Sequence, residues 1–409
     1  MPRILHVLSQ RPSLTGSGIT LDAVVRHADQ SGWRQDVVVG VPADSLHPEV
    51  GGLSRDHIHP LEFGSEELDY PVPGMSDTMP YESTRFSHMD SDRIDGYLAA
   101  WRRHIGRLVS TTRPDIVHSH HLWLVSSILK DVAPKTPMVT TCHATGLRQM
   151  QLCPHLAPTV HAGCARIDRF AVLHRSHAQQ LCDALGVTPS RVHVVGAGFR
   201  DDIFHGRDRV DPNPPRLLYV GKFAAAKGVP WLLDSVEQLA AGGTPCELHV
   251  AGAGSGEEAE ALRRRMESLG GLVVVHGQLD QTQLAKLMRR SSVCVLPSFY
   301  EGLPLVLVEA FASGCRLVAT DLPGIVEQLS PRLGDALELV AMPAMEAVDR
   351  PLPADLPAFT SRLTAAIERA LAAPPIGEPS MTHPGAVDAF TWHAVFRRVE
   401  SVWNDLLAH

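Results

Sequence analysis

Short apolar runs alternate along most of the chain with longer stretches in which apolar residues recur at helical spacing. The short runs are typical of buried strands, and the longer stretches are typical of helices that cover a sheet. This alternation predicts an α/β protein built from parallel sheets. The expected strands are residues 4–9, 36–40, 115–119, 138–142, 169–173 and 192–195 in the first half, and 216–220, 247–251, 272–276, 293–296 and 317–320 in the second.

Breaks in this alternation indicate the domain organisation. A chain of 409 residues is long enough for two or three domains, and two large α/β domains fit the pattern best. The polar stretch 206–215 has no apolar periodicity, so we interpret it as the interdomain linker. Residues 61–100 are rich in Asp and Glu and are expected to form an irregular insertion. The tail 388–407 predicts a helix whose broad apolar face must pack on another part of the chain.

A glutamate falls inside an apolar helix in the second half. The run 305–312 follows the expected strand 293–296, with Gly302 as a turn and Pro304 as the first helical residue. Glu309 lies within that run, and burying an unpaired carboxylate is costly unless the group takes up a proton. Its charge is therefore satisfied by an internal arginine, by a solvated edge of the helix, or by a ligand.

A second carboxylate, Glu301, precedes the same helix and favours the ligand interpretation. Backbone N–H groups at a helix N-terminus form an anion site, so a phosphate can lie there with Glu301 and Glu309 on either side. Carboxylates accept hydrogen bonds from hydroxyl groups. The two glutamates therefore suggest a ligand rich in hydroxyls, such as a ribose or hexose attached to a diphosphate.

Two lysines follow the first expected strand of the second half. Lys222 comes directly after Gly221 at the end of strand 216–220, and Lys227 precedes Gly228, where a helix opens. Cationic side chains at the carboxyl edge of a sheet can point at one diphosphate. The alternative is a pair of solvated surface lysines.

Glycines follow the first expected strand of the chain. Gly16 and Gly18 precede a helix-like stretch that starts at about Ile19. Glycine lets the backbone approach a phosphate or a sugar closely, and the helix dipole favours negative charge there. The pattern is not a complete G-x-G-x-x-G motif, so an ordinary tight loop is the alternative.

Histidines end two of the expected strands. His118, His120 and His121 lie close together in sequence, but a strand turns alternate side chains to opposite faces, and no carboxylate or cysteine accompanies them. We therefore expect no metal site. His143 ends strand 138–142, where α/β proteins present functional side chains, so it can donate to a sugar hydroxyl; a core histidine is the alternative.

Composition excludes several classes of protein. The net charge of -8 argues against a nucleic-acid binder, and the apolar fraction of 44% is ordinary for a globular protein. No apolar run reaches membrane-spanning length and no signal peptide precedes the first strand, so a soluble cytoplasmic protein is expected. Seven cysteines without a Cys-x-x-Cys pair indicate neither a disulfide framework nor a zinc knuckle.

Together these motifs resemble a known family. Glu301 and Glu309, within Tyr300-Glu301-Gly302-Leu303-Pro304 and the helix that follows, resemble the E-x7-E signature of the retaining group 1 glycosyltransferases of the GT-B fold. The similarity extends over most of the chain, to the Lys222 and Lys227 pair, the Gly16–Gly18 loop, His143 and the Phe390-Thr391-Trp392 tail. The resemblance implies two Rossmann-like domains that face each other across a cleft: an acceptor domain, 1–205, on which a final helix, 385–409, packs, and a donor domain, 206–384.

The resemblance also implies roles for individual residues. Lys222 and Lys227 would stabilise the β-phosphate as the bond to the sugar breaks. Glu301 would orient hydroxyls of the donor sugar, and Glu309 would bind the ribose diol. The further expected donor contacts are the backbone around Gly302, Leu303 and Pro304, the glycines Gly16 and Gly18, and Gln278 and Leu279 beside the base.

The implied reaction is a retaining, front-face transfer of a hexosyl group from a nucleotide-diphosphate sugar, with UDP-glucose or UDP-N-acetylglucosamine as the expected donor. It needs no metal, no other cofactor and no covalent enzyme intermediate. The alternatives are a GT-B nucleotide-sugar epimerase, a phosphorylase that would need pyridoxal phosphate, and a non-catalytic nucleotide-sugar sensor.

The acceptor side departs from the family's pattern. Where the family commonly has Asn-Gly-Val-Asp, this chain has Ala197-Gly198-Phe199-Arg200, so only the glycine is kept. The acidic insertion offers candidate acceptor contacts, with a solvated loop as the alternative for each: Tyr81, Ser83, Arg85, Phe86 and His88. Its negative charge opposes binding to anionic lipid, so the expected acceptor is a soluble small molecule and membrane association is not expected.

Overall fold

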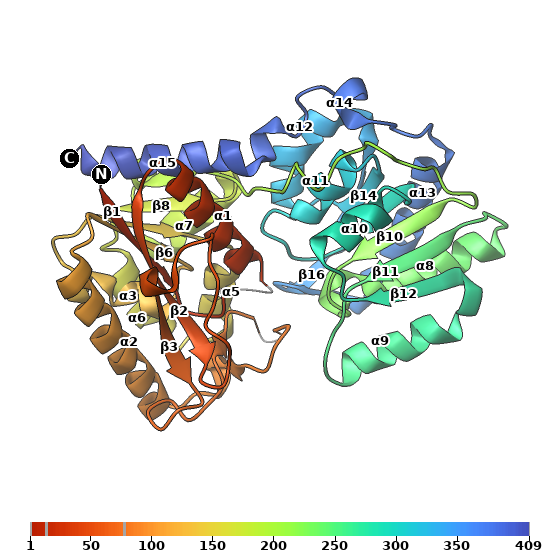
Figure 1. The fold of residues 1–409 in the computed structure, drawn as a ribbon. Coiled ribbons are helices and arrows are strands. Elements are labelled where there is room, and N and C mark those ends of the chain that lie inside the picture. Colours follow the sequence, from red (N-terminus) through yellow and green to blue (C-terminus); the bar gives the residue numbers. More distant parts are fainter. Residues whose placement is uncertain (1, 13–14, 77–78, 409) are drawn as a thin grey trace. The chain divides into compact units, whose positions relative to one another are not determined.

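The computed structural model describes residues 2–12, 15–76 and 79–408, and these form two compact units. The first comprises Met1–Gly198 together with Trp392–His409, and the second comprises Phe199–Thr391. Each unit is a parallel sheet with helices packed on it (Figure 1). The expected α/β class with two Rossmann-like units is therefore confirmed.

The first unit contains a seven-stranded sheet in the order β3-β2-β1-β6-β7-β8-β9, and every pair of neighbours is parallel. Its strands are β1 (Arg3–Leu8), β2 (Arg34–Pro42), β3 (Ile58–Phe63), β6 (Ile116–His120), β7 (Met138–Thr141), β8 (Arg169–Val172) and β9 (Val192–Val194). Its helices are α1 (Gly16–Gln30), α2 (Ser91–Thr112), α3 (Leu124–Ser127), α4 (Leu129–Val132), α5 (Thr145–Leu152), α6 (Ala157–Cys164), α7 (Arg175–Leu185) and α15 (Trp392–Leu407). The strand order reverses between β1 and β6, where open α/β sheets bind their ligands at the carboxyl edge.

The second unit contains a six-stranded parallel sheet in the order β12-β11-β10-β13-β14-β15. Its strands are β10 (Arg216–Val220), β11 (Glu247–Ala251), β12 (Val273–Gly277), β13 (Val293–Leu296), β14 (Arg316–Thr320) and β15 (Leu337–Val340). Its helices are α8 (Val229–Ala241), α9 (Glu257–Ser268), α10 (Gln281–Met288), α11 (Leu305–Ala312), α12 (Ser330–Leu333), α13 (Leu356–Ala372) and α14 (Pro379–Thr382). Here the order reverses between β10 and β13.

Two short strand pairs lie outside these sheets: β4 (Pro73–Gly74) with β5 (Thr84–Arg85), and β16 (Met345–Ala347) with β17 (Arg350–Pro351). The sequence did not predict β3 or β15. Strand β3 contains Pro60, which is tolerated because β3 is an edge strand. Strand β15 is short and contains Glu338, so its apolar run is broken.

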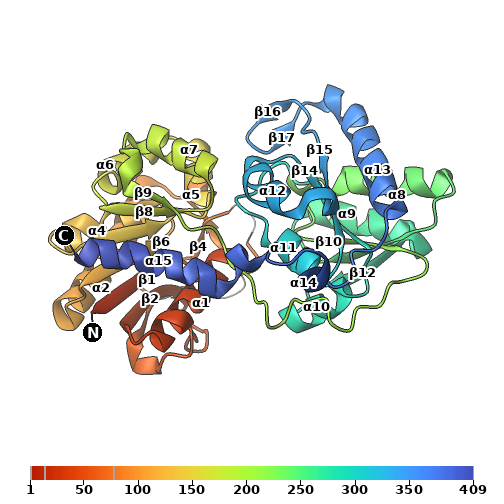
Figure 2. The same cartoon turned by 90° about the horizontal axis from the view of Figure 1, so that it is seen from above.

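The C-terminal helix α15 covers one face of the first sheet (Figures 1 and 2). Its apolar side, including Phe396 and Trp403, packs on Ile4 and Ile116 of the two central strands. The helix begins at Trp392, whereas the sequence placed residues from 385 onward on the first domain. Residues 385–391 instead belong to the second unit and include a 3-10 turn, Asp388–Phe390.

The prediction of an interdomain linker at residues 206–215 is wrong, because this segment packs on the second unit. The buried Arg209 guanidinium donates to the carbonyls of Ser291 (2.9 Å) and Ser313 (3.3 Å). The chain instead enters the second unit at Phe199, whose N–H donates to the carbonyl of Phe390 (2.8 Å). The unit boundary therefore falls after Gly198 and not after residue 205.

The insertion at 61–100 is only partly irregular. Its last ten residues are helical, because α2 begins at Ser91 with the Asp90 side chain capping its N-terminus. Phe86 is 1% exposed and packs edge-on against Tyr97 and Trp123 in the core. Phe86 therefore cannot contact an acceptor as the sequence suggested.

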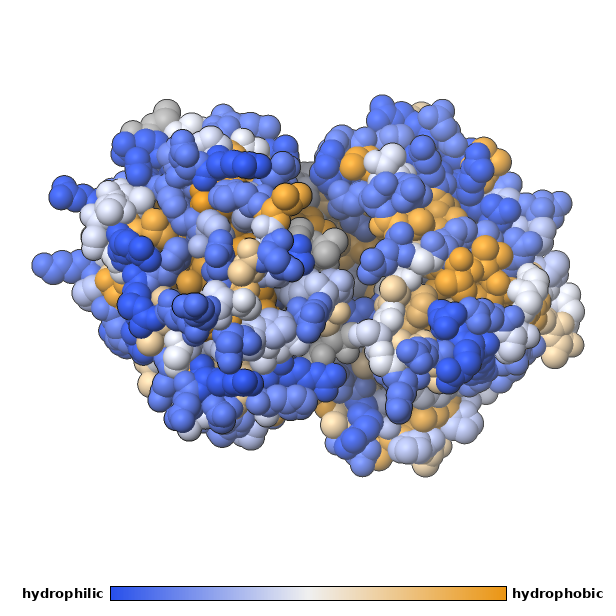
Figure 3. Space-filling model, turned by 60° about the horizontal axis from the view of Figure 1, so that its bottom comes forward, coloured by the Kyte–Doolittle hydropathy of each residue, from blue (hydrophilic) through white to orange (hydrophobic). Residues whose placement is uncertain are grey.

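The surface drawn in Figure 3 is mainly hydrophilic, with apolar residues in scattered groups. Among the helices of the described residues, none has both the length and the apolar character needed to cross a bilayer.

Candidate functional site

A lysine and a glutamate meet at the carboxyl edge of the second sheet. Lys227 ends a 3-10 turn after β10, and its Nζ lies 2.7 Å from Glu301 Oε1 and 3.2 Å from the carbonyl of Tyr300. The side chains are 26% and 21% exposed, so both groups can still meet a ligand. The pair lies beside the strand-order reversal between β10 and β13, where the fold itself favours ligand binding.

Close backbone packing brings the two loops together. Gly228 has φ +72°, and a Cβ there would lie 2.1 Å from the carbonyl oxygen of Pro297. Two residues after Pro297 and two residues before Gly228, the N–H of Phe299 donates to the carbonyl of Ala226 (3.0 Å). Only glycine permits this approach, so Gly228 positions Lys227 against the Glu301 loop.

We expect Gly228→Ala to destabilise the protein by about 2–5 kcal/mol, because it combines a left-handed backbone with a steric overlap. Gly243→Ala is the matched control, since Gly243 has φ +77° but no neighbouring atom within 4 Å of a Cβ. That control should lose only about 1–2 kcal/mol from backbone strain. Urea unfolding measures both values, and equal losses would show that the contact with Pro297 does not matter.

A hydrogen bond to its backbone carbonyl holds Lys222 near the loop that contains Glu301. The Tyr219 hydroxyl donates to the Lys222 carbonyl (2.7 Å), and Gly221 leaves no room for a side chain against that hydroxyl. Burial raises the pKa of Tyr219 well above its ordinary value, and the nearby charge of Glu301 adds to the shift. Tyr219, which sequence reasoning missed, therefore links the Lys222 backbone to the neighbourhood of Glu301.

The loop between Glu301 and α11 offers two backbone donors. Among the described residues, no acceptor meets the N–H of Gly302 or that of Leu303. Pro304 is the N-cap (φ -77°, ψ 94°) and Leu305 the first helical residue, one position later than expected. Unpaired N–H groups beside Lys227 form a place for phosphate or sugar oxygens.

Glu309 lies in α11 and keeps a small part of its side chain exposed. Within the described part of the chain no residue donates a hydrogen bond to its carboxylate, so the internal arginine is ruled out there. Desolvation raises the pKa of Glu309 to about 7. The group is thus an acceptor that only water or a ligand can satisfy.

Gln278 and Leu279 lie in the turn between β12 and α10, at the carboxyl end of an edge strand. Gln278 is exposed and Leu279 is partly exposed. Both stay predictions as contacts of the base, because no bond joins them to the lysines or glutamates described above.

In the first unit, Gly16 and Gly18 do not form the expected loop. They lie in the first turn of α1, which begins three residues before Ile19, and the N-cap Thr15 Oγ1 accepts the N–H of Gly18 (3.1 Å). The helix starts early because the threonine provides a cap that the sequence interpretation overlooked.

His143 follows β7 and lies among other histidines. Its ring centroid is 5.1 Å from that of His121 and 6.1 Å from that of His120. Desolvation lowers the pKa of His143 to about 4, and its Nε2 has no partner among the described residues. His121 and Ala144 both have positive φ (95° and 66°), so the backbone is strained in the loops that follow β6 and β7.

The candidate acceptor residues are spread over the insertion. The guanidinium carbon of Arg11 lies over the Tyr81 ring, 5.4 Å from the ring centroid. Burial raises the pKa of the Tyr81 hydroxyl. Arg85 and His88 are exposed. No described contact joins these three residues to His143, so their role stays a prediction.

Comparison with known proteins identifies the family of the chain. The family profile "Glycosyl transferases group 1" matches residues 214–344, and "Glycosyltransferase Family 4" matches residues 15–202, so the two together span most of the chain. The fold is that of the GT-B class. The chain belongs to the group 1 glycosyltransferases.

Similar proteins include a glycogen synthase of Mycobacterium tuberculosis, 28% identical over 280 residues that cover 66% of this chain and 63% of that protein. The chain thus matches less than two thirds of that relative's length. Sucrose-phosphate synthase from Thermosynechococcus elongatus has the same fold (TM-score 0.73, 18% identity, all of both chains). So does the E. coli trehalose-6-phosphate structure bound with UDP-2-fluoro glucose (TM-score 0.69, 16% identity, 99% of both chains).

Proposed function

We propose that the protein is a retaining hexosyltransferase that moves a sugar from a nucleotide-diphosphate donor to a hydroxyl of a small-molecule acceptor. The observation that carries this proposal is the Lys227–Glu301 pair beside the unpaired N–H groups of Gly302 and Leu303. A cation, two amide donors and a carboxylate at one sheet edge match a sugar attached to a diphosphate.

Each group then has a role in the transfer. The bond between the sugar C1 and the β-phosphate oxygen breaks, and Lys227, with Lys222, stabilises the charge that develops on the leaving phosphate. Glu301 accepts hydrogen bonds from the hydroxyls of the transferred sugar, and Glu309 accepts them from the ribose diol. In the first unit, His143 stays a proposed donor to a sugar hydroxyl, since its neutral ring keeps one N–H.

Retention follows if the acceptor attacks from the side that the phosphate leaves. The acceptor oxygen forms the new bond to C1, and its proton passes to the departing phosphate oxygen, so the step needs neither a protein base nor a metal ion. Glu301 is paired with Lys227, which makes it a weak nucleophile and disfavours a covalent intermediate.

The donor is proposed to be a UDP-hexose, with UDP-glucose as the first candidate. The E. coli structure with the same fold holds a UDP-glucose analogue, which supports this choice. Tyr81, Arg85 and His88 stay candidate acceptor contacts, and the many Asp and Glu residues of the segment 61–100 that contains them favour a soluble acceptor over an anionic membrane.

A donor panel tests the function. The protein is incubated with UDP-glucose, UDP-N-acetylglucosamine, GDP-mannose or ADP-glucose plus a mixture of sugar phosphates, and nucleotide release is measured. We expect release with one UDP-sugar, and NMR of the product should show the anomeric configuration of the donor.

The same panel separates the alternatives. Conversion of the donor sugar without release of nucleotide would indicate an epimerase, and binding without either reaction would indicate a sensor. Release of nucleotide at equal rates by wild type and by Lys227→Ala would contradict the proposed site. An inverted product would contradict retention alone.

A further inference from the structure

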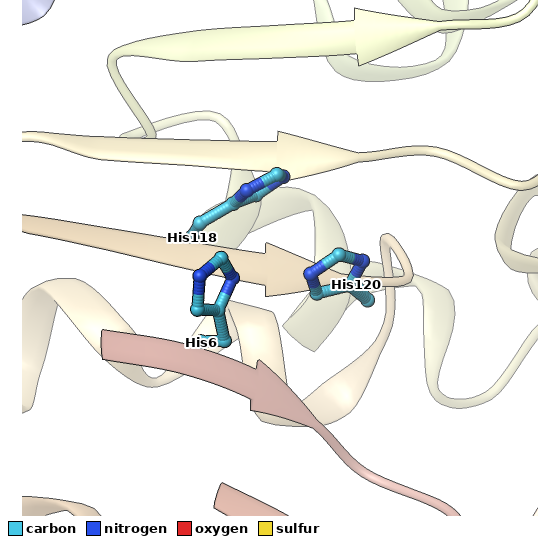
Figure 4. Close-up of side chains that lie close together, drawn as sticks. All are labelled: His6, His118 and His120. Carbon is cyan, nitrogen blue, oxygen red and sulfur yellow. The ribbon is translucent and has the colours of Figure 1, made fainter. Parts of the chain in front are cut away.

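Three buried histidines converge in the interior of the first unit (Figure 4). His6 lies on β1, and His118 and His120 lie on β6; their exposures are 0%, 0% and 2%. His118 and His120 are two residues apart on one strand and therefore share a face. The β1–β6 register places His6 directly opposite His118, so its ring joins the same group. One ring nitrogen of each lies within 4.8 Å of those of the other two.

Hydrogen bonds fix which nitrogen of His6 is free. The Gln35 amide donates its Nε2 to the carbonyl of Val25 (3.0 Å), so its Oε1 is an acceptor. His6 Nε2 lies 3.1 Å from that Oε1 and must carry the proton. The lone pair is then on Nδ1, which has no partner among the described residues.

The other two rings also leave nitrogens unpaired. His118 Nε2 lies 2.7 Å from Thr141 Oγ1, and its Nδ1 has no described partner. Neither nitrogen of His120 has one. A buried polar atom without a partner costs about 1–3 kcal/mol, so this group of unpaired nitrogens calls for an explanation.

All three rings are enclosed by the protein, and imidazole nitrogen is a common zinc ligand. The Asp36 carboxylate acts on His6 and supplies negative charge, while the edge of Trp403 closes the group against His6 and His118.

We propose that His6, His118 and His120 form a binding site for one divalent transition-metal ion of the zinc class. Three imidazoles from two adjacent strands are an established type of zinc ligand set, and the contacts of His6 with Gln35 and of His118 with Thr141 are the outer hydrogen bonds that orient such ligands. Zinc–nitrogen bonds are about 2.0–2.1 Å long, so the stacked rings of His118 and His120, whose centroids lie 4.5 Å apart, must turn toward the ion when it binds.

The site has a structural role in the fold. It joins β1 to β6 beneath α15, whereas Lys227, Glu301 and Glu309 belong to the second unit. The metal takes no part in the proposed transfer, so activity and metal binding are tested independently. Sequence reasoning missed this group because it considered the run from His118 to His121 alone, without His6.

The test measures metal in the full-length protein. It is produced in medium supplemented with zinc, dialysed against a weak chelator and measured by elemental analysis. We expect about one zinc per chain in the wild type, a fall to background in His120→Ala, and no change in His177→Asn, a buried histidine outside the group. Protein produced with Co²⁺ should show the visible absorption of a nitrogen-ligated, low-coordinate ion.

Two results would overturn the proposal: wild type without zinc or Co²⁺ absorption, or equal zinc in wild type and His120→Ala. The second would assign the metal to surface histidines. If His120→Ala does not fold, the Co²⁺ spectrum of the wild type decides, because solvent-exposed histidines give the weak absorption of an octahedral aqua complex. Thermal unfolding adds a separate readout: zinc should raise the wild-type Tm, and a chelator should lower it.

Discussion

Replacing Lys227 by alanine is expected to lower the rate of sugar transfer by roughly 10²–10³-fold, the usual effect of removing one group that stabilises a leaving oxyanion. The loss should appear in kcat, because the charge on the β-phosphate grows as the bond to the sugar breaks. Stability should change by less than about 1 kcal/mol, since the ion pair with Glu301 is partly open to solvent. Nucleotide release with the best donor measures the rate, and urea unfolding measures the stability.

Lys286→Ala is the matched control for this prediction. Lys286 is an exposed lysine on α10 of the same unit, so its loss changes the net charge equally without touching the site. It should keep wild-type kcat and KM. If Lys227→Ala raised only the donor KM and left kcat unchanged, the lysine would bind the ground state and the proposed role in bond cleavage would be wrong.

Replacing Glu309 by glutamine is expected to make the protein more stable and less active. Below the ordinary pKa of 4.5, Glu309 is protonated in both the folded and the unfolded chain, so its ionisation does not lower the free energy of unfolding. As the pH rises from 4.5 through the folded-state pKa of about 7, the unfolded chain ionises first, so the wild type loses stability. At pH 8 the variant should be more stable by about 1–3 kcal/mol, allowing for partial exposure.

Activity should change in the opposite sense. A hydroxyl bound to a carboxylate gains about 1.5–3 kcal/mol, so the donor KM of Glu309→Gln should rise roughly tenfold or more. Glu260→Gln, on the exposed side of α9, is the control and should alter neither property. The measurements are urea unfolding at pH 4 and pH 8 and donor saturation curves. A variant no more stable than wild type at pH 8 would mean that Glu309 has an internal partner.

The fold was predictable where buried strands are continuous apolar runs. Val37–Val39 and Val293–Leu296 are fully buried and were expected as strands, whereas β3 and β15 escaped because Pro60 and Glu338 interrupt their pattern. Caps are weaker signals: Thr15 starts α1 before the glycines, and Pro304 ends the loop one residue before α11.

The candidate site divides in the same way. Glu301 and Glu309 could be predicted as site residues from local spacing, because a charge within an apolar helix is visible in the sequence. The contact between Lys227 and Glu301 depends on Gly228 against Pro297, which joins segments far apart in the sequence. The polar contacts of Arg209 and the convergence of His6 with His118 likewise depend on the tertiary fold, so no local pattern could indicate them.

The return of α15 has a consequence for the order in which the protein is made. Within this chain the first sheet is synthesised before the second unit, but one face of that sheet is covered by α15, which is synthesised only after the second unit. During that interval Ile4 and Ile116 lack their final cover, and so do the imidazoles of His6 and His118 beneath Trp403. Until α15 is made, this apolar face is therefore open to solvent, and the imidazoles that we propose as metal ligands are accessible to an ion.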